Sequence, residues 1–133
     1  MPAKTESIRS TRHILVVDDD CQVLGVMADM LRQRGDRVST AAGGDSMRAV
    51  LDDGDPVDAV VLDALMPGES SYDLALHAAG FRLPVVMVSG SPHSMQFAIE
   101  HDLQLLRKPF RMQQLFDALE QAIGSGVFGQ RNL

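Results

Sequence analysis

The chain has 133 residues, of which 45% are hydrophobic, 23% are charged and only 5% are aromatic, and its net charge is −6. This length suits one compact domain with an aliphatic core and leaves no room for a second domain. The acidic composition offers no basic surface to nucleic acid or to an anionic membrane, and no apolar run reaches the about 18 residues that a membrane span needs.

The first part of the chain predicts a strand followed by a helix. Residues 1–12 are polar and lack both periodicity and the apolar stretch of a secretory signal, so we expect a disordered lead-in. Residues 14–17 are a short run of Ile, Leu and Val, typical of a strand covered on both faces, and the run stops at the three aspartates 18–20. Residues 22–34 carry apolar side chains at helical spacing, and Gly35 ends the predicted helix.

The same alternation continues to residue 123. The remaining predicted elements are strands at 37–42, 57–62, 84–88 and 103–106 and helices at 45–51, 72–79, 92–100 and 112–123. The glycine-rich residues 124–133 predict a flexible tail, so that the folded domain covers residues 13–123. Five strands that alternate with helices predict an α/β fold, a doubly wound five-stranded parallel sheet with helices on both faces.

Polar residues follow four of the predicted strands. In this fold class, ligands bind beyond the carboxyl ends of the strands, and the first, third and fourth strands are neighbours. We therefore expect these side chains to share one pocket. They are Asp18 and Asp19 after the first strand, Asp63 after the third, Ser89 after the fourth and Lys108 after the fifth.

The types of these residues indicate phosphoryl transfer. Three carboxylates in one pocket repel each other unless a cation neutralises them, and Mg²⁺ (or Mn²⁺) prefers such oxygen ligands. Lys108 adds a positive charge, Ser89 adds a hydroxyl donor, and Asp63 is the candidate nucleophile, since an aspartate can carry a phosphoryl group as an acyl phosphate. A single aspartate at a strand end is usually a turn residue or a helix cap, so the prediction rests on the joint placement. Asp20 fits the cap of the first helix better than a metal site.

Four segments of the chain resemble the motifs of the response-regulator receiver family, whose fold is of the flavodoxin-like type. The resemblance extends over residues 14–123 and is carried by residues 14–20, 61–68, 85–90 and 106–110. It implies that Asp63 is the phosphoacceptor and that Asp18 and Asp19 are the acidic pair of the metal site, with Asp19 preferred as the direct ligand. It also implies that the backbone carbonyl of Leu65 is a further metal ligand.

The resemblance assigns the switch hydroxyl to Ser89 and the conserved-type lysine to Lys108, and it implies a cis peptide bond between Lys108 and Pro109. The sequence departs from the family pattern in three segments. Leu105 replaces the usual Tyr or Phe, residues 101–102 replace a Gly-Ala pair, and Ser71 replaces a glycine. We infer that the usual aromatic rotation is absent and that activation rests on Ser89 and loop movement.

The resemblance implies a single-domain response regulator that accepts a phosphoryl group from a sensor histidine kinase or a histidine phosphotransfer protein. The lone cysteine, Cys21, fits a cytoplasmic location. The output is then a contact with a downstream protein or onward transfer in a relay, without DNA or membrane, and a homodimer is compatible with this. The face formed by residues 92–100, 103–106 and 112–123, with Leu105 and Phe116, is the expected contact surface.

Two alternatives stay open. The unusual Leu105 and residues 101–102 favour a pseudo-receiver that binds partners without phosphorylation. A phosphohydrolase with an aspartyl-phosphate intermediate is the enzymatic alternative, but Leu65 stands where such enzymes need a second acidic residue. We therefore expect no turnover of an external substrate. The four histidines lack metal-binding spacing and are expected at surface or boundary positions.

Overall fold

The computed structural model describes residues 11–66 and 70–131. Its strands are β1 (His13–Val17), β2 (Arg37–Ala41), β3 (Ala59–Asp63), β4 (Val85–Ser89) and β5 (Gln104–Arg107). Its helices are α2 (Cys21–Arg34), α3 (Gly44–Asp52), α4 (Ser71–Gly80), α5 (Pro92–Glu100) and α6 (Met112–Arg131). The predicted order of elements is confirmed, whereas the disordered lead-in predicted for 1–12 lies almost wholly outside the described residues.

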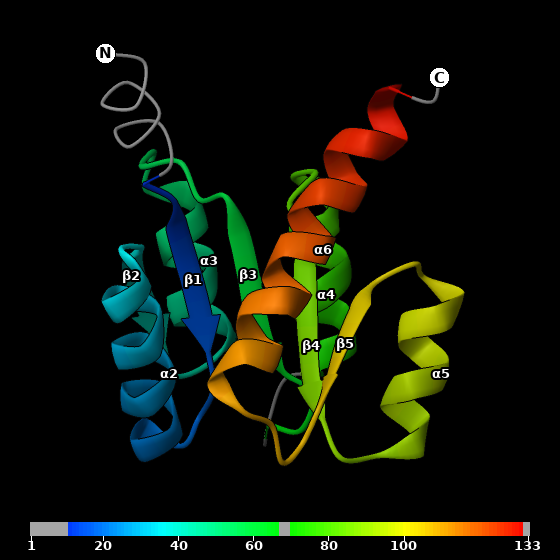
Figure 1. Ribbon diagram of the computed structural model, residues 1–133, viewed down its shortest axis with the longest axis horizontal. Coiled ribbons are helices and arrows are strands. Elements are labelled where there is room, and N and C mark those ends of the chain that lie inside the picture. Colours follow the sequence, from blue (N-terminus) through cyan, green and yellow to red (C-terminus); the bar gives the residue numbers. More distant parts are fainter. Residues whose placement is uncertain (1–10, 67–69, 132–133) are drawn as a thin grey trace.

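The five strands form one parallel sheet in the order β2-β1-β3-β4-β5. Helices α2 and α6 cover one face of the sheet, and α3, α4 and α5 cover the other (Figure 1). This is the doubly wound α/β fold that the sequence predicts. The strand order changes direction between β1 and β3, so a crevice for a ligand is expected at the carboxyl ends of these two strands.

The central strands are apolar at every position because both of their faces are covered. In β1, Ile14 and Val16 pack towards α2 and α6, whereas Leu15 and Val17 pack towards α3 and α4, and all four are fully buried. Such two-sided burial explains why the strand sequences show continuous apolar runs and no alternation. The core is aliphatic, as the low aromatic content predicts.

Helix α6 is longer than the sequence predicts. It continues to Arg131, eight residues past the predicted end at Ile123, and the flexibility expected of residues 124–133 stays a prediction. A glycine inside a helix costs only about 1 kcal/mol relative to alanine, so the backbone hydrogen bonds can continue through it. Even this helix of 20 residues is not apolar enough to cross a membrane, and the same holds for every other helix in the described part.

The expected contact surface spans the edge strand β5, with α5 and α6 beside it, and its role in partner contact stays a prediction. Leu105 packs with the core on the α4 side of the sheet, whereas Phe116 packs with the core on the α2 side. The Arg34 guanidinium also lies over the Phe116 ring, 4.9 Å from its centroid. The two residues therefore lie on opposite sides of the edge strand β5, which the expected contact surface spans.

Candidate functional site

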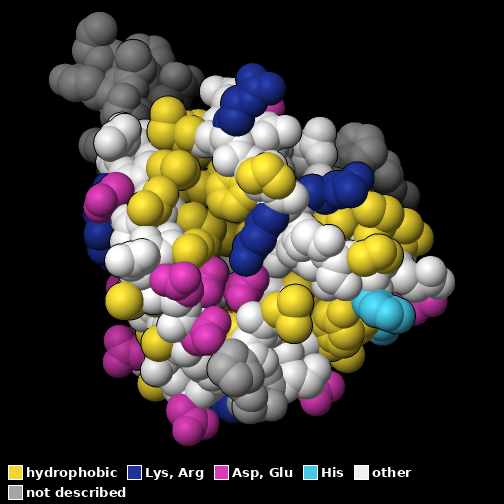
Figure 2. All heavy atoms as spheres, turned by 90° about the horizontal axis from the view of Figure 1, so that it is seen from below, with side chains coloured by type: hydrophobic (Ala, Val, Ile, Leu, Met, Phe, Trp, Pro, Cys, Tyr) yellow, Lys and Arg dark blue, Asp and Glu magenta, His cyan; other side chains and the backbone are white. Residues whose placement is uncertain are grey.

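Three carboxylates meet at the carboxyl edge of the sheet. Asp18 and Asp19 follow β1, and Asp63 is the last residue of the neighbouring strand β3. One ligand atom from each of the three lies within 4.8 Å of the other two. Seen from this edge, acidic side chains gather beside a basic one (Figure 2). The sheet topology thus brings together residues that lie 45 positions apart in the sequence.

Asp18 is a buried carboxylate with one unsatisfied oxygen. The residue is 2% exposed, its Oδ1 accepts a hydrogen bond of 2.9 Å from the Asp20 N–H, and its buried Oδ2 has no partner among the described residues. Burial raises the pKa of the Asp18 carboxyl above its ordinary value, and the charge of Asp63 adds to this, whereas the Asp20 hydrogen bond and Lys108 lower it. An orphaned carboxylate oxygen beside two further carboxylates fits a hard divalent cation.

Asp63 is paired with the predicted lysine. Its side chain is 5% exposed, and its Oδ1 accepts a hydrogen bond of 3.1 Å from Lys108 Nζ, whose side chain is 42% exposed. The lysine backbone is fixed where β5 ends, because the Lys108 N–H donates to the carbonyl of Ser89 at 3.0 Å. The Lys108–Pro109 peptide bond is cis, as predicted. The ammonium group therefore stands at the rim of the pocket, above a buried carboxylate.

Ser89 and Leu65 lie on the two segments that flank this pair. Ser89 ends β4, is 4% exposed, and accepts a hydrogen bond of 2.9 Å from the Ser91 N–H through its Oγ. Leu65 follows Asp63 by two residues, and its side chain is turned to solvent, with 74% exposed. An exposed leucine at this place supplies no acid or base to the pocket. Residues 67–69, the first two of which belong to the motif at 61–68, lie outside the described residues.

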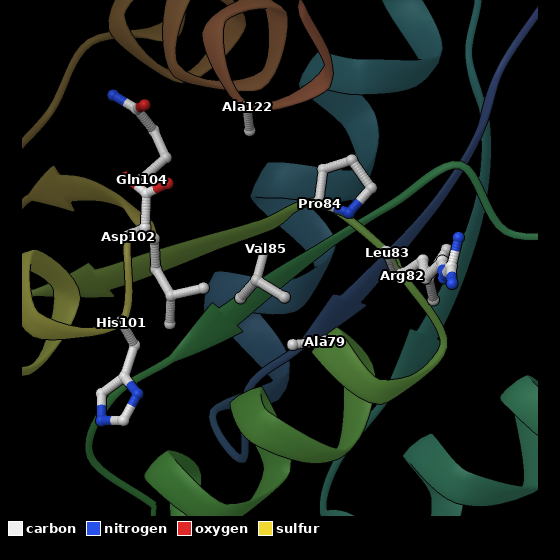
Figure 3. A pocket seen from close by; sticks show the side chains of 10 residues that line it. Ala79, Arg82, Leu83, Pro84, Val85, His101, Asp102, Gln104 and Ala122 are labelled. Atoms are coloured by element: carbon white, nitrogen blue, oxygen red, sulfur yellow. The ribbon is translucent and has the colours of Figure 1, made fainter. Parts of the chain in front are cut away.

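A separate cavity of about 300 Å³ lies at the opposite, amino edge of β4 and β5 (Figure 3). Arg82, His101 and Asp102 are among the residues that line it, and Arg82 and His101 lie at opposite ends of it, so their side chains do not converge. A binding site needs a few polar groups directed at one point. The chemistry therefore concentrates at the carboxyl edge, where the three carboxylates and Lys108 meet.

If the carboxylate cluster binds a divalent cation, that cation should stabilise the folded protein. We expect Mg²⁺ to raise the free energy of unfolding at pH 7, by about 2.7 kcal/mol at a concentration 100 times its Kd. Because the folded-state pKa of Asp18 is raised, the metal-free protein loses stability as pH rises from the ordinary carboxyl pKa through the raised one. The stabilisation by Mg²⁺ should grow over the same pH window, since the metal binds the ionised form. Urea denaturation with and without Mg²⁺ at several pH values measures both trends.

The matched variant is Asp18→Asn, which keeps the shape of the side chain and removes its charge. It should lose most of the Mg²⁺ stabilisation and should leave the metal-free protein at least as stable as the wild type at pH 7. Equal stabilisation by Mg²⁺ in the two proteins would contradict the assignment of Asp18 to the metal site.

Asp20 caps helix α2 and stands outside the carboxylate cluster. Its side chain accepts hydrogen bonds from the Gln22 N–H at 2.9 Å and the Val23 N–H at 3.3 Å. We expect Asp20→Ala to lower the free energy of unfolding by about 1 kcal/mol, and Asp20→Asn, which can still cap, to change it little. The increment from Mg²⁺ should persist in both variants. Its loss in Asp20→Asn would show that Asp20 is a metal ligand as well as a cap.

Comparison of the chain with known proteins identifies its family. The family model described as "Response regulator receiver domain" matches residues 14–120. The transcriptional regulatory protein TcrA of Mycobacterium tuberculosis is 32% identical over 111 residues, which cover 80% of this chain and 44% of TcrA. The chain therefore spans less than half the length of this curated relative.

Two solved structures show the same architecture. The receiver domain of NtrX from Brucella abortus is 29% identical, with a TM-score of 0.74, and the match covers 84% of this chain and 98% of that domain. A CheY-like response regulator receiver domain protein from Methanospirillum hungatei gives a TM-score of 0.79 at 22% identity, covering 90% of this chain and 99% of that one. At this level of identity the second match supports the fold alone.

Proposed function

Because the chain belongs to the response regulator receiver domain family, we propose that it serves two-component signalling by accepting a phosphoryl group on Asp63. The observation that carries the proposal is the contact between Asp63 and Lys108 at 3.1 Å, set beside the Asp18–Asp19 pair. A buried carboxylate that faces a fixed cation and two further carboxylates has the parts of a phosphoryl-acceptor site.

In the proposed reaction, a carboxylate oxygen of Asp63 attacks the phosphorus of a phosphohistidine on the donor protein. The new P–O bond forms as the P–N bond breaks, and the imidazole leaves with its electron pair. Lys108 balances the charge on the phosphoryl oxygens, and the Ser89 hydroxyl donates a hydrogen bond to one of them. Asp18, Asp19, Asp63 and the Leu65 carbonyl would hold Mg²⁺ or Mn²⁺, which supplies positive charge for the phosphoryl group when it is bound.

We propose a sensor histidine kinase or a histidine phosphotransfer protein as the donor and an unidentified protein as the downstream partner, in the cytoplasm. The net charge of −6 supports a protein partner over DNA for this domain. The chemistry on Asp63 is self-modification and slow hydrolysis, without turnover of an external substrate. In this proposal, residues 13–123 act as a receiver unit of the single-domain type, and self-association of that unit is compatible with the same mechanism.

A pseudo-receiver that binds partners without phosphorylation is the second candidate. It is favoured by Leu105, which has no hydroxyl and no ring, and by His101 and Asp102 in place of a Gly-Ala pair. The pocket formed by the three carboxylates and Lys108 favours a phosphorylated receiver over a pseudo-receiver. A phosphohydrolase finds less support, since the residue two positions after Asp63 is an exposed leucine.

The testing experiment is incubation with acetyl phosphate and Mg²⁺, followed by intact-mass analysis. We expect a gain of one phosphoryl group that is lost when EDTA removes the metal. No gain of mass, together with no binding of Mg²⁺, would overturn the proposal and favour the pseudo-receiver.

A further inference from the structure

Tyr72 joins helices α4 and α5 next to the site. It is the single tyrosine of a chain that has no tryptophan. Its ring stacks on Phe97 of α5, with centroids 4.3 Å apart and planes inclined by 15°. Its hydroxyl lies 3.3 Å from the Oγ of Ser94, which is 1% exposed. One side chain therefore holds α5 through both a ring contact and a hydrogen bond.

Tyr72 also stands between the two segments that leave the phosphoryl-acceptor pocket. A cavity of about 420 Å³ separates residues 64–66, which follow Asp63, from Ser91 and Ser94, which follow Ser89. Tyr72 is part of the wall of this cavity. A movement of either segment relative to the other must therefore change the surroundings of the Tyr72 ring.

The hydrogen bonds of Ser89 link such a movement to phosphorylation. In this structure, Ser89 Oγ accepts from the Ser91 N–H, and Ser91 Oγ in turn caps α5 by accepting from the His93 N–H at 3.2 Å. Rotation of the Ser89 side chain towards a phosphoryl group on Asp63 removes the bond to Ser91. The capping residue Ser91 and the first turn of α5 then lose the hydrogen bond that joins them to Ser89.

The first turn of helix α5 can shift towards β5, because a cavity lies between them. A cavity of about 70 Å³ lies between Ser89, Met95 and Leu105. Leu105 has neither a ring to fill this space nor a hydroxyl to bond Ser89. Since packed interfaces change between discrete arrangements and do not deform continuously, a shift of the first turn of α5 would reset its contact with Tyr72.

We propose that Tyr72 couples phosphorylation to helix α5, through its contacts with Ser94 and Phe97. The inference rests on the proposed function of Asp63. Phosphorylation of Asp63 would then change the position of α5 and of its exposed residues, such as Ile99, which is 74% exposed.

The first test uses tyrosine fluorescence, because the emission above 300 nm of a protein without tryptophan comes from its tyrosine, and this chain has one. Acetyl phosphate and Mg²⁺ are added while aliquots are taken for intact mass. We expect the emission intensity to change in step with the phosphoryl mass, and to stay constant in Asp63→Asn. Full phosphorylation with unchanged emission would overturn the coupling and leave the proposed function standing. No phosphorylation would overturn both.

The second test compares Tyr72→Ala with Phe81→Ala by hydrogen exchange of the α5 backbone. Phe81 is a matched control, since it is a half-exposed aromatic residue at the other end of α4 whose ring meets His77 edge-on. In wild type and Phe81→Ala, phosphorylation should change the exchange of residues 92–100. In Tyr72→Ala, phosphoryl uptake should persist while the response of α5 is lost. A wild-type response of α5 in Tyr72→Ala would contradict the proposal.

Discussion

Replacement of Asp63 by asparagine is expected to abolish phosphoryl uptake and to leave the fold intact. The amide has nearly the shape of the carboxylate, and its oxygen can still accept the hydrogen bond that Lys108 donates at 3.1 Å. It lacks the nucleophilic oxygen, and loss of a covalent nucleophile costs on the order of 10⁶ in rate in a well-studied protease. Removal of one of three clustered charges also relieves repulsion with Asp18. Intact mass after exposure to acetyl phosphate and Mg²⁺, and urea denaturation, measure the two effects.

Asp29→Asn is the matched control for this variant, since Asp29 lies on α2 with 75% of its side chain exposed. It should take up the phosphoryl group as the wild type does. If Asp63→Asn gained the phosphoryl mass at the rate of the control, another residue would be the acceptor.

Replacement of Lys108 by glutamine is expected to slow phosphoryl uptake by about 10²- to 10³-fold, the usual cost of one preorganised donor to a developing charge. Lys108 is the cation that contacts Asp63 among the described residues. Its loss leaves the charges of Asp18, Asp19 and Asp63 without this compensation, so the metal-free variant should also unfold at a lower urea concentration. The rate of mass gain and the urea midpoint are the measurements.

Arg107→Gln is the control for Lys108→Gln, because it changes the net charge equally on an exposed neighbouring residue. Its rate of uptake should stay within a small factor of the wild type. Equal rates in Lys108→Gln and Arg107→Gln would remove Lys108 from the reaction.

The fold could be predicted from the sequence because both the strands and their boundaries leave local signals. Continuous apolar runs such as residues 59–62 mark strands with two covered faces, and polar residues mark their carboxyl ends. The rule that ligands bind at these ends then brings Asp18, Asp63 and Lys108 together without knowledge of any distance. The cap at Asp20 follows from the same local reasoning.

The features that were missed depend on contacts between distant segments. His13 was expected at the surface or at a boundary, yet it is 3% exposed, with hydrogen bonds of 2.8 Å to the Pro56 carbonyl and 2.7 Å to Ser39 Oγ. These partners of His13 lie 43 and 26 residues away in the sequence, so no local sequence pattern indicates the contacts. The stacking of Tyr72 on Phe97 is of the same kind, because it joins two helices across the sheet face.

The absence of an aromatic residue at Leu105 was visible in the sequence, but its consequence was not. The structure shows an aromatic contact on a different pair of elements, α4 and α5, and no local sequence pattern indicates it. The expected surface with Leu105 and Phe116 spans the edge strand β5, because the two residues pack on opposite faces of the sheet, and its role in partner contact stays a prediction.

Locating the phosphoryl group tests directly whether Asp63 is the acceptor. The protein is treated with acetyl phosphate and Mg²⁺, the acyl phosphate is reduced with borohydride, which converts a phosphorylated aspartate to homoserine, and the peptides are analysed by mass spectrometry. We expect homoserine at position 63 and at no other aspartate, with none formed when EDTA is present. Reduction at Asp18 or Asp19, or unmodified Asp63 in a protein that has gained the phosphoryl mass, would contradict this expectation.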